Sequence, residues 1–281
     1  MNKNNIVNQV SSLIMDEYMN KNGIFNNINE LLEMQCPETI EPHSEEHANF
    51  YFYLIFNDHG TKSINLYKRF KDKYQNFPEL FNAKYIVESY ENNEESLLEE
   101  HTSKLGLRYP KVATKSWIEN SKILLDKFDG KAINMFRSTN DALELFKTIN
   151  KFRSYGPKTS GLLLRVILGM GFNRNLENIE NVPLPVDIHD TRIAFNCGIY
   201  RPNGIDDLQK IYTNPSHIKK IEKLWRDSAK FIGVDWEELD RALWLLGSKG
   251  CVNKECQICP INDICQTGKE FIVNDKNLFN Y

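Results

Sequence analysis

The 281-residue chain lacks the long apolar segments that place a protein in or across a membrane. No run approaches the roughly 18 uncharged apolar residues of a membrane-spanning helix. The opening residues, MNKNNIVNQVSS, lack the apolar core of a secretory signal peptide. Hydrophobic residues make up 41% and charged residues 26% of the chain, which is typical of a globular protein. The sequence therefore predicts a cytoplasmic protein without a membrane partner.

Strand-like alternation of apolar and polar residues is scarce, and internal repeats and low-complexity linkers are absent. Apolar residues recur instead with the helical period of about 3.6 residues. The predicted helices span residues 49–56, 63–74, 114–128, 141–149, 161–170, 218–232 and 236–246. Gly and Pro fall between these segments, where helices should end. We therefore predict an all-α fold of short helices, with the acidic residues 91–100 in a loop or an exposed helical turn.

The net charge is small, −3, which by itself does not favour a nucleic-acid-binding protein. It is unevenly divided, however: −9 over residues 1–100, +8 over residues 101–165 and −2 over the remainder. Local positive charge, not net charge, neutralises phosphates. The basic segment is thus either a nucleic-acid-binding surface or a helical surface that happens to be basic.

One lysine stands in a tight turn near the end of the basic segment, in the sequence YGPKTSG. Gly156 can adopt a positive φ, which suits a sharp reversal between two helices. Pro157 suits the first position of the second helix, whose first N–H groups can bind a phosphate. Lys158 falls in the first helical turn, where the helix dipole disfavours an ammonium and so favours a nucleophilic amine. The alternative is a purely structural helical hairpin with a surface lysine.

An aspartate follows at the start of the next predicted helix. Pro185 and Val186 predict an extended lead-in, with Asp187 at the helix N-cap. The segment 161–186 is long enough to run out along a helix and return, which would let Asp187 face Lys158 across a groove. The alternative is that Asp187 caps the helix and does nothing else.

Cysteine is sparse, with six residues, and four of them lie within 15 residues as C-x4-C-x2-C-x5-C. In a cytoplasmic protein this spacing indicates a metal site rather than disulfides. Zinc with four thiolates and a [4Fe–4S] cluster are both compatible with it. Cys36 and Cys197 have no such spacing and are expected to be buried thiols.

These motifs resemble those of the helix–hairpin–helix DNA glycosylases related to endonuclease III. The family pattern is close to L-P-G-V-G-x-K-T-A followed by V-D-x-H-x-x-R. Gly156 matches the second hairpin glycine and Lys158 the catalytic lysine. The second motif is matched with the same spacing by Val186, Asp187, His189 and Arg192. One departure is that Phe152–Tyr155 replaces L-P-G-V, so Ser154 stands where the family has its first hairpin glycine.

The cysteines also resemble those of the family, which carries C-x6-C-x2-C-x5-C around a [4Fe–4S] cluster. The last two intervals match and the first is two residues shorter. The resemblance therefore favours a [4Fe–4S] cluster over zinc. Its ligands would be Cys251, Cys256, Cys259 and Cys265.

The resemblance also implies two all-α lobes. Residues 44–172 would form a helical barrel domain that ends in the helix–hairpin–helix. Residues 1–43 and 173–281 would form the second helical domain, closed by the cluster loop 251–265. The implied DNA contacts are Arg153, Ser154, Tyr155, Gly156, Thr159, His189 and Lys249, with Lys254 as a further candidate.

Family members often insert a glutamine from an LSxQ-type turn into the gap left by a flipped base. The corresponding residues 54–60, LIFNDHG, contain no glutamine, so Asn57, Asp58 and His59 are the candidates. Aromatic residues at 51–53 and Trp117 could stack on a base, although their helical spacing favours a place in the core.

The function implied by the resemblance is a bifunctional DNA glycosylase and abasic-site lyase, acting as a nucleoid-associated monomer. Its partner would be double-stranded DNA with a damaged or modified base or an abasic site. Lys158 would attack C1′ and form a Schiff base, Asp187 would assist, and β-elimination would cut the strand. The alternatives are a non-catalytic or monofunctional damage-binding protein, an iron–sulfur redox or sensor protein, and a glycosylase that defends against modified foreign DNA.

Overall fold

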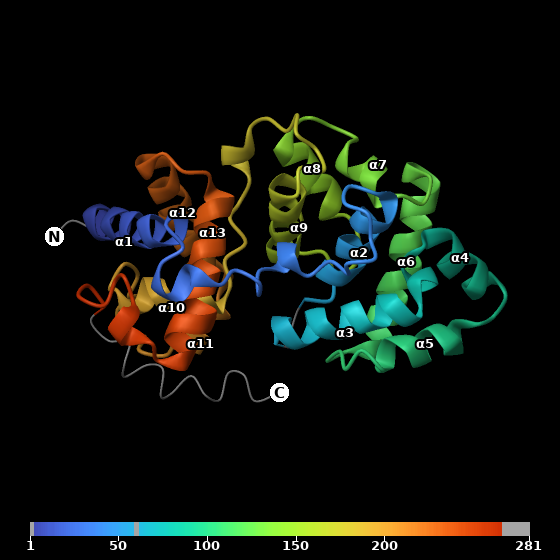
Figure 1. The fold of residues 1–281 in the computed structure, drawn as a ribbon, viewed down its shortest axis with the longest axis horizontal. Coiled ribbons are helices and arrows are strands. Elements are labelled where there is room, and N and C mark those ends of the chain that lie inside the picture. Colours follow the sequence, from blue (N-terminus) through green and yellow to red (C-terminus); the bar gives the residue numbers. More distant parts are fainter. Residues whose placement is uncertain (1–2, 59–61, 266–281) are drawn as a thin grey trace. The chain divides into compact units, whose positions relative to one another are not determined.

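The computed structural model describes residues 3–58 and 62–265 and is mainly helical (Figure 1). Helices make up 66% of it, and the described residues form no β-strand beyond a single bridge between Asp141 and Glu177. The all-α prediction is confirmed. None of the helices described is both long and apolar enough to cross a membrane.

The chain divides into two compact units. The described residues up to Leu31, together with those from Pro183 onward, form one unit, which we call the N/C unit. Leu32–Val182 form the other, which we call the central unit. The N-terminal segment thus packs with the C-terminal part of the chain, and a continuous stretch between them forms a body of its own.

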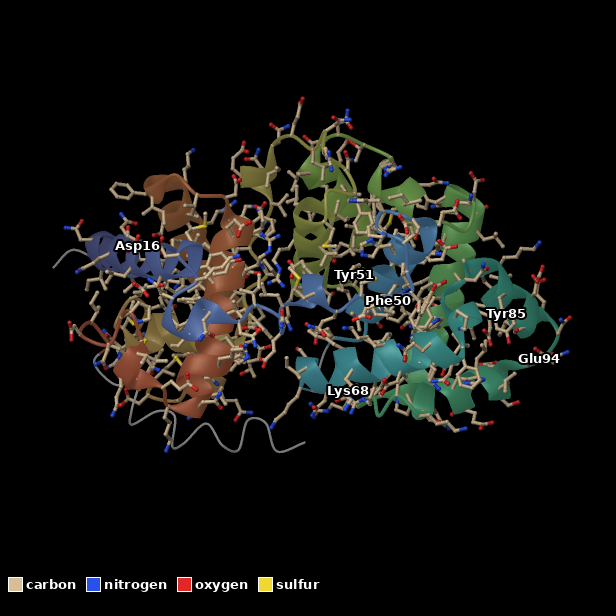
Figure 2. All side chains as sticks on the ribbon, in the orientation of Figure 1. Asp16, Phe50, Tyr51, Lys68, Tyr85 and Glu94 are labelled. Atoms are coloured by element: carbon tan, nitrogen blue, oxygen red, sulfur yellow. The ribbon has the colours of Figure 1, made fainter. Side chains whose placement is uncertain are left out.

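The central unit is built from short helices around an aromatic core. Its α-helices are α2 (Glu45–Ile55), α3 (Ser63–Asn76), α4 (Ala83–Glu91), α5 (Glu95–Ser103), α6 (Pro110–Phe128), α7 (Ala132–Phe136), α8 (Ala142–Ile149) and α9 (Pro157–Gly169). Residues 50–55 of α2 are apolar or aromatic and fully buried; Figure 2 labels Phe50 and Tyr51 among them. The Trp117 ring of α6 stacks on Tyr53 at a centroid distance of 5.4 Å and on Phe70 at 5.8 Å. The aromatic residues considered for base stacking therefore lie in the core.

The central unit starts earlier and ends later than the predicted range 44–172. At its start, the buried carboxylate of Glu33 pairs with Arg165 of α9, with 3.0 Å between Oε1 and Nε. The hydroxyl of Tyr51 donates to the Glu33 carbonyl oxygen at 2.7 Å. At its end, the Asn173 amide donates to the carbonyl oxygens of Phe136 and Thr139. Buried polar groups need such partners, so these flanking segments are part of the unit.

The N/C unit packs its N-terminal helix against two C-terminal helices. Its α-helices are α1 (Lys3–Met19), α10 (Ile188–Asn196), α11 (Leu208–Tyr212), α12 (Pro215–Ile232) and α13 (Trp236–Leu245). Helix α1 packs against α12 and α13, and Ser228 of α12 donates to the hydroxyl oxygen of Ser11 at 2.8 Å. Helix α13 continues into a π-helical turn, Leu246–Cys251, which leads into the cysteine segment. The unit thus presents both the Asp187 helix and the cysteines.

Candidate functional site

The predicted lysine turn joins α8 to α9 through residues 150–156. Pro157 is the first residue of α9 and Lys158 lies in its first turn, as predicted. The predicted positive φ at Gly156 is wrong: Gly156 is the N-cap of α9 with φ −103°, and Ser154 takes the positive φ of 64°. Ser154 can hold this less favourable conformation because its hydroxyl is bonded to the hydroxyl of Ser116 in α6, at 2.7 Å.

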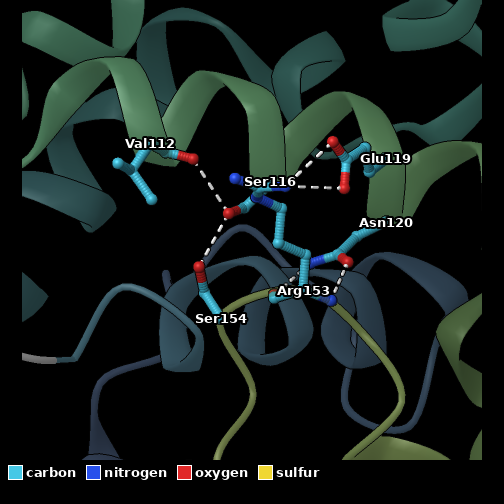
Figure 3. A network of polar contacts seen from close by, with 6 residues as sticks. All are labelled: Val112, Ser116, Glu119, Asn120, Arg153 and Ser154. Atoms are coloured by element: carbon cyan, nitrogen blue, oxygen red, sulfur yellow. Dashed lines mark hydrogen bonds and ion pairs between the residues drawn. The ribbon is translucent and has the colours of Figure 1, made fainter.

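Helix α6 holds this turn through a network of polar contacts (Figure 3). The Asn120 side chain accepts from the Arg153 N–H at 2.7 Å and donates to the Arg153 carbonyl oxygen at 3.0 Å. The Arg153 guanidinium lies 3.1 Å from each Glu119 carboxylate oxygen. Two bonds from one amide fix the backbone of the turn, so the turn is preorganised on α6. A phosphate contact by Arg153 would have to compete with Glu119.

The start of α9 combines an ordered backbone with open space. The Gly156 N–H donates to the Thr159 hydroxyl at 2.9 Å, which fixes the first helical turn. A Cβ added to Gly156 would meet nothing within 4 Å, so the glycine leaves the backbone accessible to a ligand. The first N–H groups of a helix have no partner within the helix and can bind an anion. This geometry suits a phosphate next to Lys158.

A buried carboxylate lies beside the lysine. The sequence had suggested this residue only as a candidate to fill the gap left by a flipped base. Asp58 follows α2 and is 3% exposed, and its Oδ2 is 4.0 Å from Lys158 Nζ. The Ser63 hydroxyl donates to Asp58 Oδ1 at 2.8 Å and holds the carboxylate in place. Lys158 keeps 34% of its side chain exposed. Asp58 therefore orients a lysine that a ligand can still reach.

Of the other two candidates to fill the gap left by a flipped base, the structure describes Asn57; it also describes Tyr155, a predicted DNA contact. Asn57 is buried and donates its side-chain amide to the Tyr53 carbonyl oxygen at 2.8 Å, so it points into the central unit. His59 lies outside the described residues. Tyr155 is 5% exposed and donates its hydroxyl to the Phe52 carbonyl oxygen at 2.7 Å. Any DNA contact by Tyr155 would therefore come from its backbone.

Asp187 is the N-cap of α10, as predicted. Its carboxylate accepts from the His189 N–H at 2.6 Å, and the Asp190 carboxyl accepts from the Asp187 N–H at 2.7 Å. Burial, followed by the charges of Asp187 and Asp240, raises the pKa of Asp190 well above its usual value. A protonated Asp190 can donate a hydrogen bond to its neighbour, which leaves the negative charge of the pair on Asp187. The dipole of α10 favours negative charge at this helix start, where both carboxyl groups lie.

The other two residues of the second motif connect α10 to the turn that precedes the cysteines. Arg192 lies 3.0 Å from His189 Nδ1 and donates to the Gly247 carbonyl oxygen at 3.3 Å. His189 is 8% exposed, and its ring packs edge-on against Trp244. A Cβ on Gly247 would lie 2.4 Å from the Cβ of His189, so only glycine permits this approach. In this unit His189 and Arg192 have a structural role.

The four clustered cysteines lie together after α13. Burial raises the pKa of the Cys251 thiol to about 12, and the neighbouring thiols of Cys259, Cys265 and Cys256 raise it further, against the lowering effect of Arg192. Burial likewise raises the pKa of Cys259 to about 11. Cys197 is fully buried, as predicted, but it also shares a hydrogen bond with Cys265. The sequence did not reveal this fifth thiol, because it belongs to a distant helix end.

The donor set fits a thiolate-bound metal centre. A positively charged centre would stabilise thiolates that burial otherwise keeps protonated. Within residues 3–58 and 62–265, no three His, Cys, Asp or Glu side chains lie close enough together to hold one metal ion. The support for a metal centre is therefore the gathering of four thiols in one segment, not a formed coordination shell.

Lys249 and Lys254, the predicted phosphate contacts before and within this segment, differ in their surroundings. The Lys249 side chain is only 15% exposed, and its Nζ donates to the Asn27 carbonyl oxygen at 2.9 Å and lies 3.5 Å from Glu30. Lys254 is exposed, with a φ of 61°. Lys249 therefore ties the π-helical turn to the N-terminal segment of its own unit.

The two predicted catalytic residues belong to different units. Lys158, Asp58 and the turn on α6 lie in the central unit, whereas Asp187 and the cysteines lie in the N/C unit. Neither unit by itself holds both predicted catalytic residues.

Replacing Asp58 with Asn should make Lys158 more reactive toward an amine-acylating reagent. The variant lacks the ion pair between Asp58 and the amine, which acylation must otherwise break, so we expect acylation at pH 8 to be about two- to fivefold faster. The rate is measured by mass spectrometry of the Lys158 peptide, with exposed Lys147 in the same sample as reference. Equal rates in wild type and variant, at unchanged thermal stability, would show that the ion pair has no influence on the amine.

The cysteine segment should bind iron. We expect purified protein to be brown, with broad absorbance at about 400 nm and about four irons per chain. The Cys256→Ser variant should lose most of the iron and colour, whereas Cys36→Ser, which changes a cysteine of the central unit, should retain both. Colourless protein with one zinc per chain would identify a zinc site instead.

Comparisons with known proteins do not assign the chain to a family. No protein-family model matches the chain. No curated protein matches it either. A functional conclusion must therefore come from the lysine turn, the Asp187 helix and the cysteine segment.

Proposed function

We propose that the protein is a bifunctional DNA glycosylase and abasic-site lyase that uses Lys158 as its nucleophile. The observation that carries the proposal is the position of Lys158 in the first turn of α9. The preceding turn is hydrogen-bonded to α6, and Gly156 leaves the backbone at the start of α9 accessible to a ligand. A phosphate of the DNA backbone bound at this helix start would bring a neighbouring sugar within reach of the lysine. The basic segment 101–165 supplies the positive charge for that contact.

The chemistry assigned to Lys158 needs a neutral amine. The target nucleotide leaves the base stack. The lysine nitrogen then attacks C1′, and the glycosidic bond breaks with its electron pair leaving on the base, which is protonated as it departs. The sugar ring opens to an imine between C1′ and the lysine. Loss of a C2′ proton then expels the 3′ phosphate, which cuts the strand. In this proposal Asp58, whose Oδ2 lies 4.0 Å from Nζ, orients the amine.

Asp187 contributes negative charge from the other unit. In this proposal its carboxylate stabilises the positive charge that develops on the sugar as the base leaves. The neutral Asp190 beside it would keep that charge on Asp187. The four cysteines would hold an iron–sulfur centre, which when bound braces the segment 251–265 as a structural metal does.

Removing the Lys158 amine should abolish covalent capture of DNA. We expect wild-type protein mixed with an abasic-site duplex and borohydride to form a stable adduct, and Lys158→Ala to form none while still binding the duplex. The matched control is Lys230→Ala, which removes an exposed lysine from α12, outside the basic segment, and should leave the adduct unchanged. An adduct of normal yield in Lys158→Ala would overturn the proposal. Tight binding without any adduct in wild type would favour a damage-binding protein.

Neutralising Asp187 should slow the reaction without unfolding α10. An Asn side chain can still accept the N-cap hydrogen bond, so the Asp187→Asn variant loses only the charge. We expect single-turnover cleavage to fall about a hundredfold or more with little change in duplex affinity. Asp141→Asn makes the same change at the N-cap of α8 and should react normally. Near-normal turnover of Asp187→Asn would leave Asp187 as a helix cap alone.

A further inference from the structure

The first half of α6 adjoins the lysine turn and is hydrogen-bonded to it. Ser116 of α6 bonds to Ser154, and one helical turn earlier the Val112 carbonyl oxygen accepts from the same Ser116 hydroxyl at 2.9 Å (Figure 3). Val112 is 41% exposed, so the surface continues from the turn onto the helix without a covering element. Any ligand bound along the turn would therefore meet this part of α6.

Cations and one aromatic ring occupy that surface. Lys111 and Lys115 lie one turn apart on α6 and are exposed, and the Lys111 side chain is 83% exposed. Tyr109, at the N-cap of α6, is 50% exposed, and the Arg108 guanidinium lies over its ring at 5.3 Å from the centroid. We call these four residues, Arg108, Tyr109, Lys111 and Lys115, the α6 surface. Cations interleaved with an exposed aromatic ring occur on nucleic-acid-binding faces.

Acidic neighbours do not cancel this charge. Glu99 of α5 lies 3.9 Å from Lys111 and is itself 44% exposed, which makes the pair weak. Glu100 pairs with Lys104, and Glu119 pairs with Arg153. Lys115 is exposed, and the segment 101–165 keeps a net charge of +8. The positive end of the α6 dipole adds to this potential.

We infer that the α6 surface is a second phosphate-binding surface for duplex DNA, continuous with the turn at residues 150–156. The inference rests on the proposed function in so far as DNA is the partner. Lys111 and Ser116 are separated by about 7.5 Å along the helix axis. Successive phosphates of one strand are about 3.4 Å apart along the duplex axis. Lys111 can therefore bind a phosphate about two nucleotides from the one held at the turn, and Lys115 can bind one next to it.

The test compares charge removal at the two ends of one helix. Lys111→Gln combined with Lys115→Gln removes two charges from the α6 surface. Lys122→Gln combined with Lys127→Gln removes two from the other end, where Lys122 lies over the Tyr90 ring. Affinity for an undamaged 25-base-pair duplex is measured by fluorescence anisotropy over a range of NaCl concentrations. We expect the slope of log K against log salt concentration to become shallower by about 1.8 in the first variant and to stay unchanged in the second.

Two outcomes overturn the inference: equal slopes in the two double variants, or an unchanged slope in the first. Thermal unfolding of each variant shows whether the fold is preserved. Borohydride trapping by the same proteins at saturating concentration separates the two proposals. Adduct formation with unaltered slopes would contradict DNA binding by the α6 surface and would still support the lyase proposal. A shallower slope in the first variant without any adduct would support DNA binding by the α6 surface and would contradict the lyase proposal.

Discussion

The attachment of one turn to one helix is the constraint on which the proposed chemistry depends. Residues 150–156 must reverse the chain between two short helices, and their own backbone cannot satisfy all its polar groups. Helix α6 supplies the missing partners: Asn120 bonds to both the N–H and the carbonyl of Arg153, and Ser116 bonds to Ser154. Because these bonds leave the turn a single arrangement, the start of α9 and the side chain of Lys158 have a defined position before any ligand binds. Preorganisation of this kind lets a site stabilise a transition state without reordering itself during the reaction.

In both units a buried carboxyl group lies next to a predicted catalytic residue. In the central unit a buried carboxylate, Asp58, lies beside a partly exposed lysine. In the N/C unit two carboxyls share a helix start, and burial raises the pKa of one of them, Asp190, well above its usual value. Each unit thus buries one carboxyl group that controls the state or position of a second, more reactive group. Asp58 and Asp190 are 3% and 1% exposed and act through the groups beside them, whereas Asp187, at 8%, is itself buried within its unit.

Much of the helical framework could be predicted from periodicity, because an apolar face every 3.6 residues is a local property of the chain. Helices α3, α8, α12 and α13 were predicted within a few residues of their ends. Helix α1 was missed because its apolar residues are diluted by Asn and Ser, and its burial comes from packing against α12. The acidic segment was predicted as a loop or exposed helical turn, whereas α4 runs to Glu91 and α5 begins at Glu95 after a short turn. The positive φ was assigned to Gly156 on propensity, but tertiary hydrogen bonds placed it on Ser154.

By itself, the sequence determined the helical fold class, the place of Lys158 in a first helical turn, Asp187 as an N-cap, and the grouping of four cysteines. Each of these depends on neighbours within a few residues, so spacing and residue type are sufficient. Only the tertiary structure decided which distant groups surround them: Asp58 beside Lys158, Glu119 on Arg153, Asn27 on Lys249 and Cys197 beside Cys265. These contacts join segments separated by 34 to 222 residues. Such pairings are set by how whole helices pack, and no local pattern in the chain encodes them.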